Sequence, residues 1–145
     1  MQARVSRGQQ IAGLGGLALF IVLFLPWFGE FGVSKSGWEG QSATDIYLLI
    51  TALVAVVTAL GAGRGAIIPG LTMNGATALL GGVATILLVW LSFLDYPAGA
   101  DRKVGVYLGL VAAAVVAFGG YKAAQDETGG ARRAAPRGRR RRPTR

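Results

Sequence analysis

Hydrophobic residues gather in four long runs that contain no charged side chain and no histidine. The runs cover residues 9–28, 46–62, 71–94 and 104–121. A helix rises about 1.5 Å per residue, so about 17–25 apolar residues are needed to cross the hydrocarbon core of a bilayer, which is about 30 Å thick. Each run has this length, and the pattern predicts four membrane-spanning helices within residues 1–122.

Charged residues lie in the connections between these runs, and their distribution indicates an orientation. Lys and Arg are dense before the first run and after Tyr121, and Arg64 lies in the second connection, whereas the alternate connections contain only Lys35, Arg102 and Lys103. Connections rich in Lys and Arg remain in the cytoplasm. We therefore expect an all-α integral membrane protein of the bacterial cytoplasmic (inner) membrane, a four-helix bundle with both termini cytoplasmic.

The first run also resembles a signal peptide, because Arg4 and Arg7 precede the apolar residues 11–25. Signal peptidase requires small residues at its cleavage site, whereas residues 25–28 of this run are Leu-Pro-Trp-Phe. We therefore expect the first span to be retained.

Two connections carry local signals for helix ends. Asp45 can accept hydrogen bonds from the free N–H groups at the start of the second helix, which explains it more simply than a catalytic role. Pro69 and Gly70 interrupt the uncharged residues 65–94, so we expect the third helix to begin near Leu71. Aromatic residues mark the outer helix ends and are expected to anchor them among the lipid headgroups: Trp27, Phe28, Phe31, Trp38, Trp90, Phe93 and Tyr96.

Small residues recur at four-residue spacing in every run, which places them on one face of each helix. Their missing side chains let helices approach closely in lipid, where hydrophobic burial does not drive association. We expect these residues to pack the four helices together, and contact with another copy is the alternative. The principal candidates are Gly16, Ala55, Ala59, Gly82, Gly105, Gly109 and Ala113.

An internal similarity joins the two halves of the chain. Residues 15–25 align without gaps on residues 81–91, with one Gly-Gly pair over the other. Such a repeat would give two tandem helical hairpins related by an axis along the membrane normal.

The reactive side chains are few. The chain has no Cys and no His, so disulfides, thiolate sites and the usual zinc or haem ligands are excluded. The acidic residues Glu30, Glu39, Asp45, Asp95 and Asp101 could form an outer cluster that binds a cation or acts as an acid–base pair, but ordinary solvated loop charge explains them better. We expect no enzymatic activity, no catalytic or metal-binding residue and no cofactor. The outer-interface motif comprises Pro26, Trp27, Trp38, Asp45 and Asp95.

Residues 123–145 differ in composition from the rest of the chain. They are rich in Gly, Ala, Pro and Arg and lack apolar periodicity, which predicts a disordered cytoplasmic tail. Such a tail can enforce the orientation or bind anionic lipid headgroups. Specific binding to nucleic acid is not expected, because no aromatic residues are interleaved to stack on bases. The candidates for lipid contact are Arg137, Arg139, Arg140, Arg141 and Arg142.

Several of these motifs together resemble small four-span membrane proteins of high-GC Gram-positive (actinobacterial) type. They are residues 25–28 (Leu-Pro-Trp-Phe), residues 36–39 (Ser-Gly-Trp-Glu), Asp45, and residues 93–99 (Phe-Leu-Asp-Tyr-Pro-Ala-Gly). A weaker likeness is to SPW-repeat membrane proteins, although Leu25 replaces the Ser of that motif and the second half lacks the Pro-Trp pair. Neither likeness implies an activity.

Two functions remain in view. The first is a non-enzymatic membrane protein that acts by packing with itself or with another membrane protein. The alternative is a small transporter or channel component whose pore forms in an oligomer. The small-residue faces favour the first, and the absence of any ionisable group within the runs disfavours an ion or proton pathway through a single copy.

Overall fold

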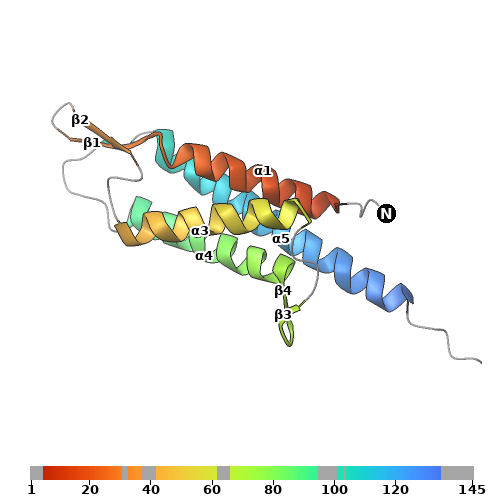
Figure 1. Ribbon diagram of the computed structural model, residues 1–145. Helices are drawn as coiled ribbons and strands as arrows, with labels where there is room; N and C mark the ends of the chain where they lie inside the picture. The colour runs from red at the N-terminus through yellow and green to blue at the C-terminus, as the bar shows by residue number, and fades with distance from the viewer. Residues whose placement is uncertain are drawn as a thin grey trace, which may run out of the picture.

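The computed structural model describes residues 5–30, 33–36, 42–61, 66–94, 101–102 and 104–134. Within these ranges the chain forms four helices: α1 (Arg7–Val22), α3 (Ser42–Ala59), α4 (Met73–Phe93) and α5 (Val104–Ala134) (Figure 1). The predicted helical fold is confirmed. By length and composition, α4 and residues 104–130 of α5 can cross a membrane, whereas the apolar helix α3 and the 16-residue helix α1 are shorter.

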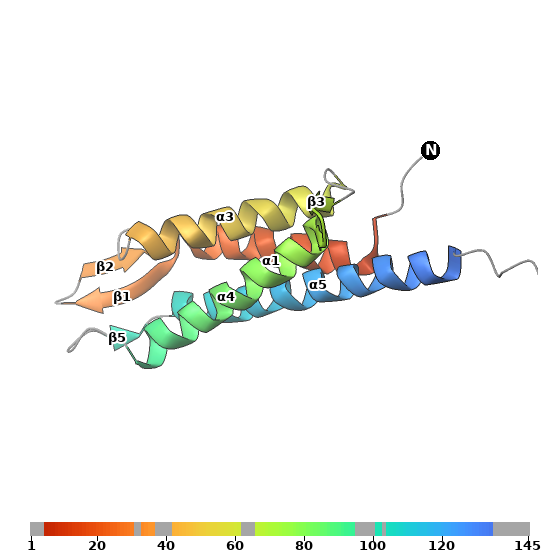
Figure 2. The same cartoon turned by 90° about the horizontal axis from the view of Figure 1, so that it is seen from below.

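In the described parts of the connections the chain forms five short strands, which we did not predict. β1 (Pro26–Glu30) pairs antiparallel with β2 (Val33–Ser36) and with β5 (Asp101–Arg102), in the order β2-β1-β5. This sheet caps one end of the bundle, which we call the sheet end (Figure 2). β3 (Ala66–Ile68) and β4 (Leu71–Thr72) form a hairpin at the opposite end, the hairpin end, where α1 begins and α5 ends (Figure 1).

Local sequence sets the helix starts at the hairpin end. Ser6 and Gln9 form a reciprocal capping box at the start of α1, and the Thr72 side chain accepts a hydrogen bond from the Gly75 N–H at the start of α4. Pro69 and Gly70 are the two central residues of the turn between Ile68 and Leu71. Gly70 has a φ of +90°, which suits the third position of a type II turn, and Pro69 suits the second. The interruption expected at Pro69-Gly70 is therefore a tight turn, and α4 begins shortly after it.

Two expected helix ends were wrong. The first helix ends at Val22 rather than at residue 28, because Pro26 disfavours helical backbone in the residue before it and the chain turns into β1. The last helix continues past Tyr121 to Ala134, because polar residues such as Lys122 and Gln125 remain good helix formers. Residues 123–134 of the expected disordered tail are thus helical, and residues 135–145 lie outside the described residues.

Helix α5 is the centre of the bundle, with α1 and α4 packed along it and α3 packed on α1 (Figures 1 and 2). Neighbouring glycines on α5 face different partners. A Cβ atom on Gly119 would overlap the backbone of Ala12 in α1, and one on Gly120 would lie 2.5 Å from the Ala78 nitrogen in α4. At these close approaches α1 and α4 both pack antiparallel to α5.

Burial is inverted relative to a water-soluble bundle. Many of the largest apolar side chains point outward on every helix, including Leu14 (70% exposed), Leu53 (52%) and Ile86 (68%). Much of the interior consists of Ala, Gly and Thr, and large buried side chains concentrate near the sheet end around Trp27. Soluble proteins rarely expose large contiguous apolar patches, so the distribution is typical of a protein surrounded by lipid.

Candidate functional site at the two ends of the bundle

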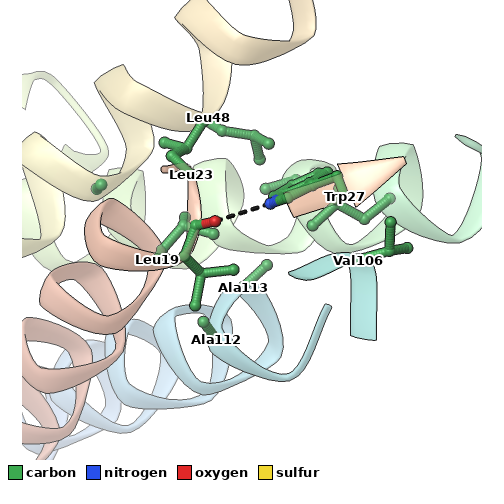
Figure 3. Packing of buried hydrophobic residues seen from close by; sticks show 11 residues of the cluster. Leu19, Leu23, Trp27, Leu48, Val106, Ala112 and Ala113 are labelled. Atoms are coloured by element: carbon green, nitrogen blue, oxygen red, sulfur yellow. Dashed lines mark hydrogen bonds between the residues drawn. The ribbon is translucent and has the colours of Figure 1, made fainter. Parts of the chain in front are cut away.

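Trp27 is the largest buried side chain at the sheet end and is 1% exposed. Its indole Nε1–H donates a hydrogen bond to the carbonyl oxygen of Val22, the last residue of α1, at 2.7 Å (Figure 3). The ring packs against Leu48 of α3, Val106 of α5 and Leu23, which directly follows α1. The expectation that Trp27 anchors in the headgroup layer was wrong, because its indole fills the core and its polar atom is satisfied there.

Two glycines of α5 provide the space for this ring. A Cβ atom on Gly105 would overlap the Trp27 ring and approach the Pro26 carbonyl oxygen to 2.6 Å. A Cβ atom on Gly109 would lie 3.0 Å from Trp27 Cζ2. The predicted packing residues Gly105 and Gly109 therefore form a flat surface on α5 against which the indole lies.

The rest of the outer-interface motif is only partly described. Pro26 is half-buried at the start of β1, and Asp45 is 3% exposed in the first turn of α3, where a carboxylate is favoured by the helix dipole. Ser92, near the end of α4, is also buried, and its hydroxyl has no hydrogen-bond partner among the described residues. Trp38 and Asp95 lie outside the described residues.

The small residues of α1 and α3 meet as a pair of close contacts. A Cβ atom on Gly16 would lie 2.7 Å from the Ala55 Cβ, and one on Gly13 would overlap the Ala59 Cβ. Ala113 is fully buried in the core, in contrast to Gly82, which has open space where its side chain would be. On α4 the packed glycine is the neighbouring Gly81, which contacts Ala117 of α5.

This pattern bears on the proposed repeat. The aligned glycines Gly15 and Gly81 both pack against α5, Gly15 on Val115 and Val116, and Gly81 on Ala117. If two hairpins were related by symmetry, Gly81 would contact α3, the counterpart of α5. The contacts of these glycines therefore do not follow the symmetry expected for two tandem hairpins.

A chain of polar side chains joins three helices at the hairpin end. The Gln9 side-chain amide of α1 donates to Asn74 Oδ1 of α4 at 3.3 Å, and Asn74 Nδ2 donates to Glu127 Oε1 of α5 at 2.5 Å. Gln9 and Asn74 are buried, whereas Glu127 is exposed. The sequence offers Asn74, Thr51, Thr58, Thr77 and Thr85 as candidates for interhelical hydrogen bonds, but it does not indicate Glu127, which falls in the segment expected to be disordered.

Two hydroxyl groups extend this polar layer to α3. Thr58 Oγ1 and Thr77 Oγ1 lie 2.9 Å apart and share a buried hydrogen bond between α3 and α4. Each hydroxyl is also within hydrogen-bonding distance of a carbonyl oxygen of its own helix, that of Val54 or Met73. Tyr47 forms a second link, because its hydroxyl donates to the Leu80 carbonyl oxygen at 2.9 Å.

We call these side chains, Gln9, Asn74, Glu127, Thr58 and Thr77, the clasp, because their hydrogen bonds join the helices to one another. Its members are amides and hydroxyls with one carboxylate, and they satisfy one another across four helices. Within the described residues, no three His, Cys, Asp or Glu side chains gather closely enough to hold a metal ion. The basic candidates Arg137, Arg139, Arg140, Arg141 and Arg142 lie outside the described residues.

Comparison with known proteins gives no further assignment. No protein-family model, no curated protein and no solved structure matches the chain. Function is therefore argued from the arrangement of the chain's own residues.

Proposed function

We propose that this protein crosses the bacterial cytoplasmic membrane with all four helices and acts without catalysis, by packing with a second copy or with another membrane protein. The observation that carries the proposal is the inverted burial: large apolar side chains face outward on every helix, and small or hydrogen-bonded polar residues fill much of the interior. In lipid this costs nothing, whereas in water it would expose a continuous apolar surface.

The shorter helices fit the same bilayer. At about 1.5 Å per residue, α1 is about 24 Å long and α3 about 27 Å, against a hydrocarbon core of about 30 Å. Apolar residues 23–25 extend α1 toward the sheet end, and exposed Leu60 extends α3 toward the hairpin end. Helix α1 packs along α5 and α3 packs against α4, and α4 and α5 have the length of full spans.

Residue accessibility tests the four crossings and their orientation. The chain contains no Cys, so single cysteines can be introduced without removing any. With the hairpin end in the cytoplasm, an impermeant maleimide added to intact cells should label Lys35→Cys but should label Ser6→Cys and Thr128→Cys only after permeabilisation. Labelling of all three in intact cells, or recovery of the protein in the soluble fraction, would contradict the proposal.

Gly82 offers a place for another helix. It lies on the outward side of α4 with open space above it, near exposed Leu79 and Ile86 one turn away on either side. A small residue on a lipid-facing surface allows close approach of a second helix. Oxidative crosslinking of Gly82→Cys in native membranes should therefore give a dimer or a mixed complex, and Val111→Cys, exposed on α5, should not. Monomer alone from both variants would count against the proposal.

The second candidate is a transporter or channel component, and the buried amide and hydroxyl layer at the hairpin end is the observation that favours it. Trp27 and its apolar neighbours fill the bundle at the other end, so a path through one copy would be blocked there. Transport would need a pore between copies. Purified protein in proteoliposomes that moves no solute or ion faster than empty vesicles would exclude this candidate.

A further inference from the structure

An open groove lies between α1 and α3 in the half of the molecule toward the hairpin end. Its volume is about 420 Å³, and it is lined by Gln10, Gly13, Leu14, Leu17, Val56, Ala59 and Leu60. Ligand sites in proteins commonly have volumes of about 300–1,000 Å³. Close contact between Gly13 and Ala59 forms its floor, and the larger leucines stand on both sides of it.

The groove is apolar along most of its length and polar at one end only. Gln10 is the sole polar residue of its lining and lies nearest the start of α1. Arg7 is exposed one turn earlier, and spacings of three and seven residues place Arg7, Gln10 and Leu14 on one side of the helix. Arg7 and Gln10 therefore lie at one end of an apolar groove that runs along α1.

We propose that this groove binds an anionic phospholipid of the cytoplasmic leaflet, with one acyl chain between Leu17 and Leu60 and the phosphate beside Arg7 and Gln10. The inference rests on the proposed membrane location. A lipid of that leaflet points its chain from the headgroup toward the bilayer centre, which is the direction of α1 from Arg7 to Leu17. The Arg guanidinium suits a phosphate because it offers paired N–H donors in one plane.

The one-ended polarity favours a lipid over a helix from another protein. A transmembrane helix in this groove would present apolar residues along its whole length and would leave Arg7 and Gln10 without complementary charge. A phospholipid matches both parts, with its charge at the membrane surface and its chain in the apolar part. A protein partner in the groove is an outcome of the test below.

The headgroup is tested in nanodiscs that contain equal amounts of phosphatidylglycerol and phosphatidylcholine with the same acyl chains. Native mass spectrometry of the released full-length protein should show retained phosphatidylglycerol. Arg7→Gln should reduce that retention about tenfold, as expected for loss of one charge-assisted hydrogen bond. Arg133→Gln, which removes an exposed charge far along α5, should leave it unchanged. Equal loss in both variants, or loss in neither, would overturn the proposal.

The acyl chain is tested by filling the groove. Leu17→Trp should displace the lipid by a similar factor, whereas Leu79→Trp, on the outward surface of α4, should not. Unchanged retention in Leu17→Trp, or loss of a dimer or partner mass instead of lipid, would also overturn the proposal. Failure of the unaltered protein to enter nanodiscs would refute the membrane location itself, and circular dichroism of each variant reports whether its helices are intact.

Discussion

The two ends of the bundle are stabilised in different ways. At the sheet end, one large ring lies on two glycines, and its single polar atom is satisfied by a nearby carbonyl group. At the hairpin end, side-chain hydrogen bonds join Gln9, Asn74 and Glu127 across three helices, and a threonine pair joins the fourth. The sheet end depends on shape and the hairpin end on directional polar contacts.

The difference matters because these interactions would have different strengths in the proposed membrane environment. Removing a large aromatic side chain from a core costs about 3–5 kcal/mol, since the cavity that remains is only partly refilled. Interhelical hydrogen bonds in membranes contribute about 0.6 kcal/mol on average, because the unfolded chain in lipid also finds partners. The sheet end should therefore set the stability of the bundle, while the hairpin end can open at lower cost.

Replacement of Trp27 by Ala tests the stronger end. The loss of the indole leaves a cavity against Gly105 and Gly109, and we expect the free energy of unfolding to fall by about 3–5 kcal/mol. Helix content followed by circular dichroism during denaturation by SDS in mixed micelles measures this change. Trp90→Ala is the matched control, because Trp90 is 58% exposed on α4 and should contribute little. Equal losses in the two variants would show that Trp27 is not a core residue.

Replacement of Asn74 by Leu tests the weaker end. The change keeps the size of the side chain but removes the hydrogen-bond partner of both Gln9 and Glu127. We expect the free energy of unfolding to fall by about 1–2 kcal/mol, because the buried Gln9 Nε2 group loses its partner while Gln9 Oε1 still accepts from the Ser6 N–H. Thr85→Val is the control, since the Thr85 hydroxyl donates to the Gly81 carbonyl oxygen of its own helix.

The same variant should loosen α5 locally. Trypsin should cleave after Lys122 faster in Asn74→Leu than in the unaltered protein, because Glu127 no longer holds the end of α5 to α4. An unchanged cleavage rate would mean that the Asn74–Glu127 bond does not fix this segment.

The threonine pair gives the smallest expected effect. A double-mutant cycle of Thr58→Val and Thr77→Val should yield a coupling energy of about 0.6 kcal/mol, the usual size for one interhelical hydrogen bond in a membrane protein. Stability of the two single variants and the double variant in the same micelles provides the four values. If the stability losses of the two single variants simply add in the double variant, the hydrogen bond between the two hydroxyls contributes nothing to the free energy of unfolding.

The sequence predicted the features that depend on local pattern. Apolar runs located the four helices of the described residues, and Pro69-Gly70 marked the turn before α4 because the backbone preference of this pair is intrinsic. Regular spacing of small residues indicated the packing faces of Gly16 and Gly105. The same spacing pointed to Gly82, whereas Gly81 makes the contact with α5. Spacing shows which residues share a helix face, but it does not show which face another helix covers.

Features that depend on distant partners could not be predicted. The pattern of Pro26 and Trp27 is the same for a headgroup anchor and for a buried ring, and only the glycines of α5 decide between them. Glu127 lies in a polar segment, and its bond to Asn74, 53 residues away, is what identifies it as part of the clasp. Hydropathy measures solvent preference and carries no information about such pairings.

Helix α5 links the two ends of the bundle mechanically. It contacts Trp27 through Gly105 near its start and Asn74 through Glu127 near its end, and its 31 residues form one unbroken helix about 46 Å long. Rigid helices transmit displacement that a loop would absorb. A shift of α5 along its axis would therefore change both contacts together, the one with Trp27 at the sheet end and the one with Asn74 at the hairpin end.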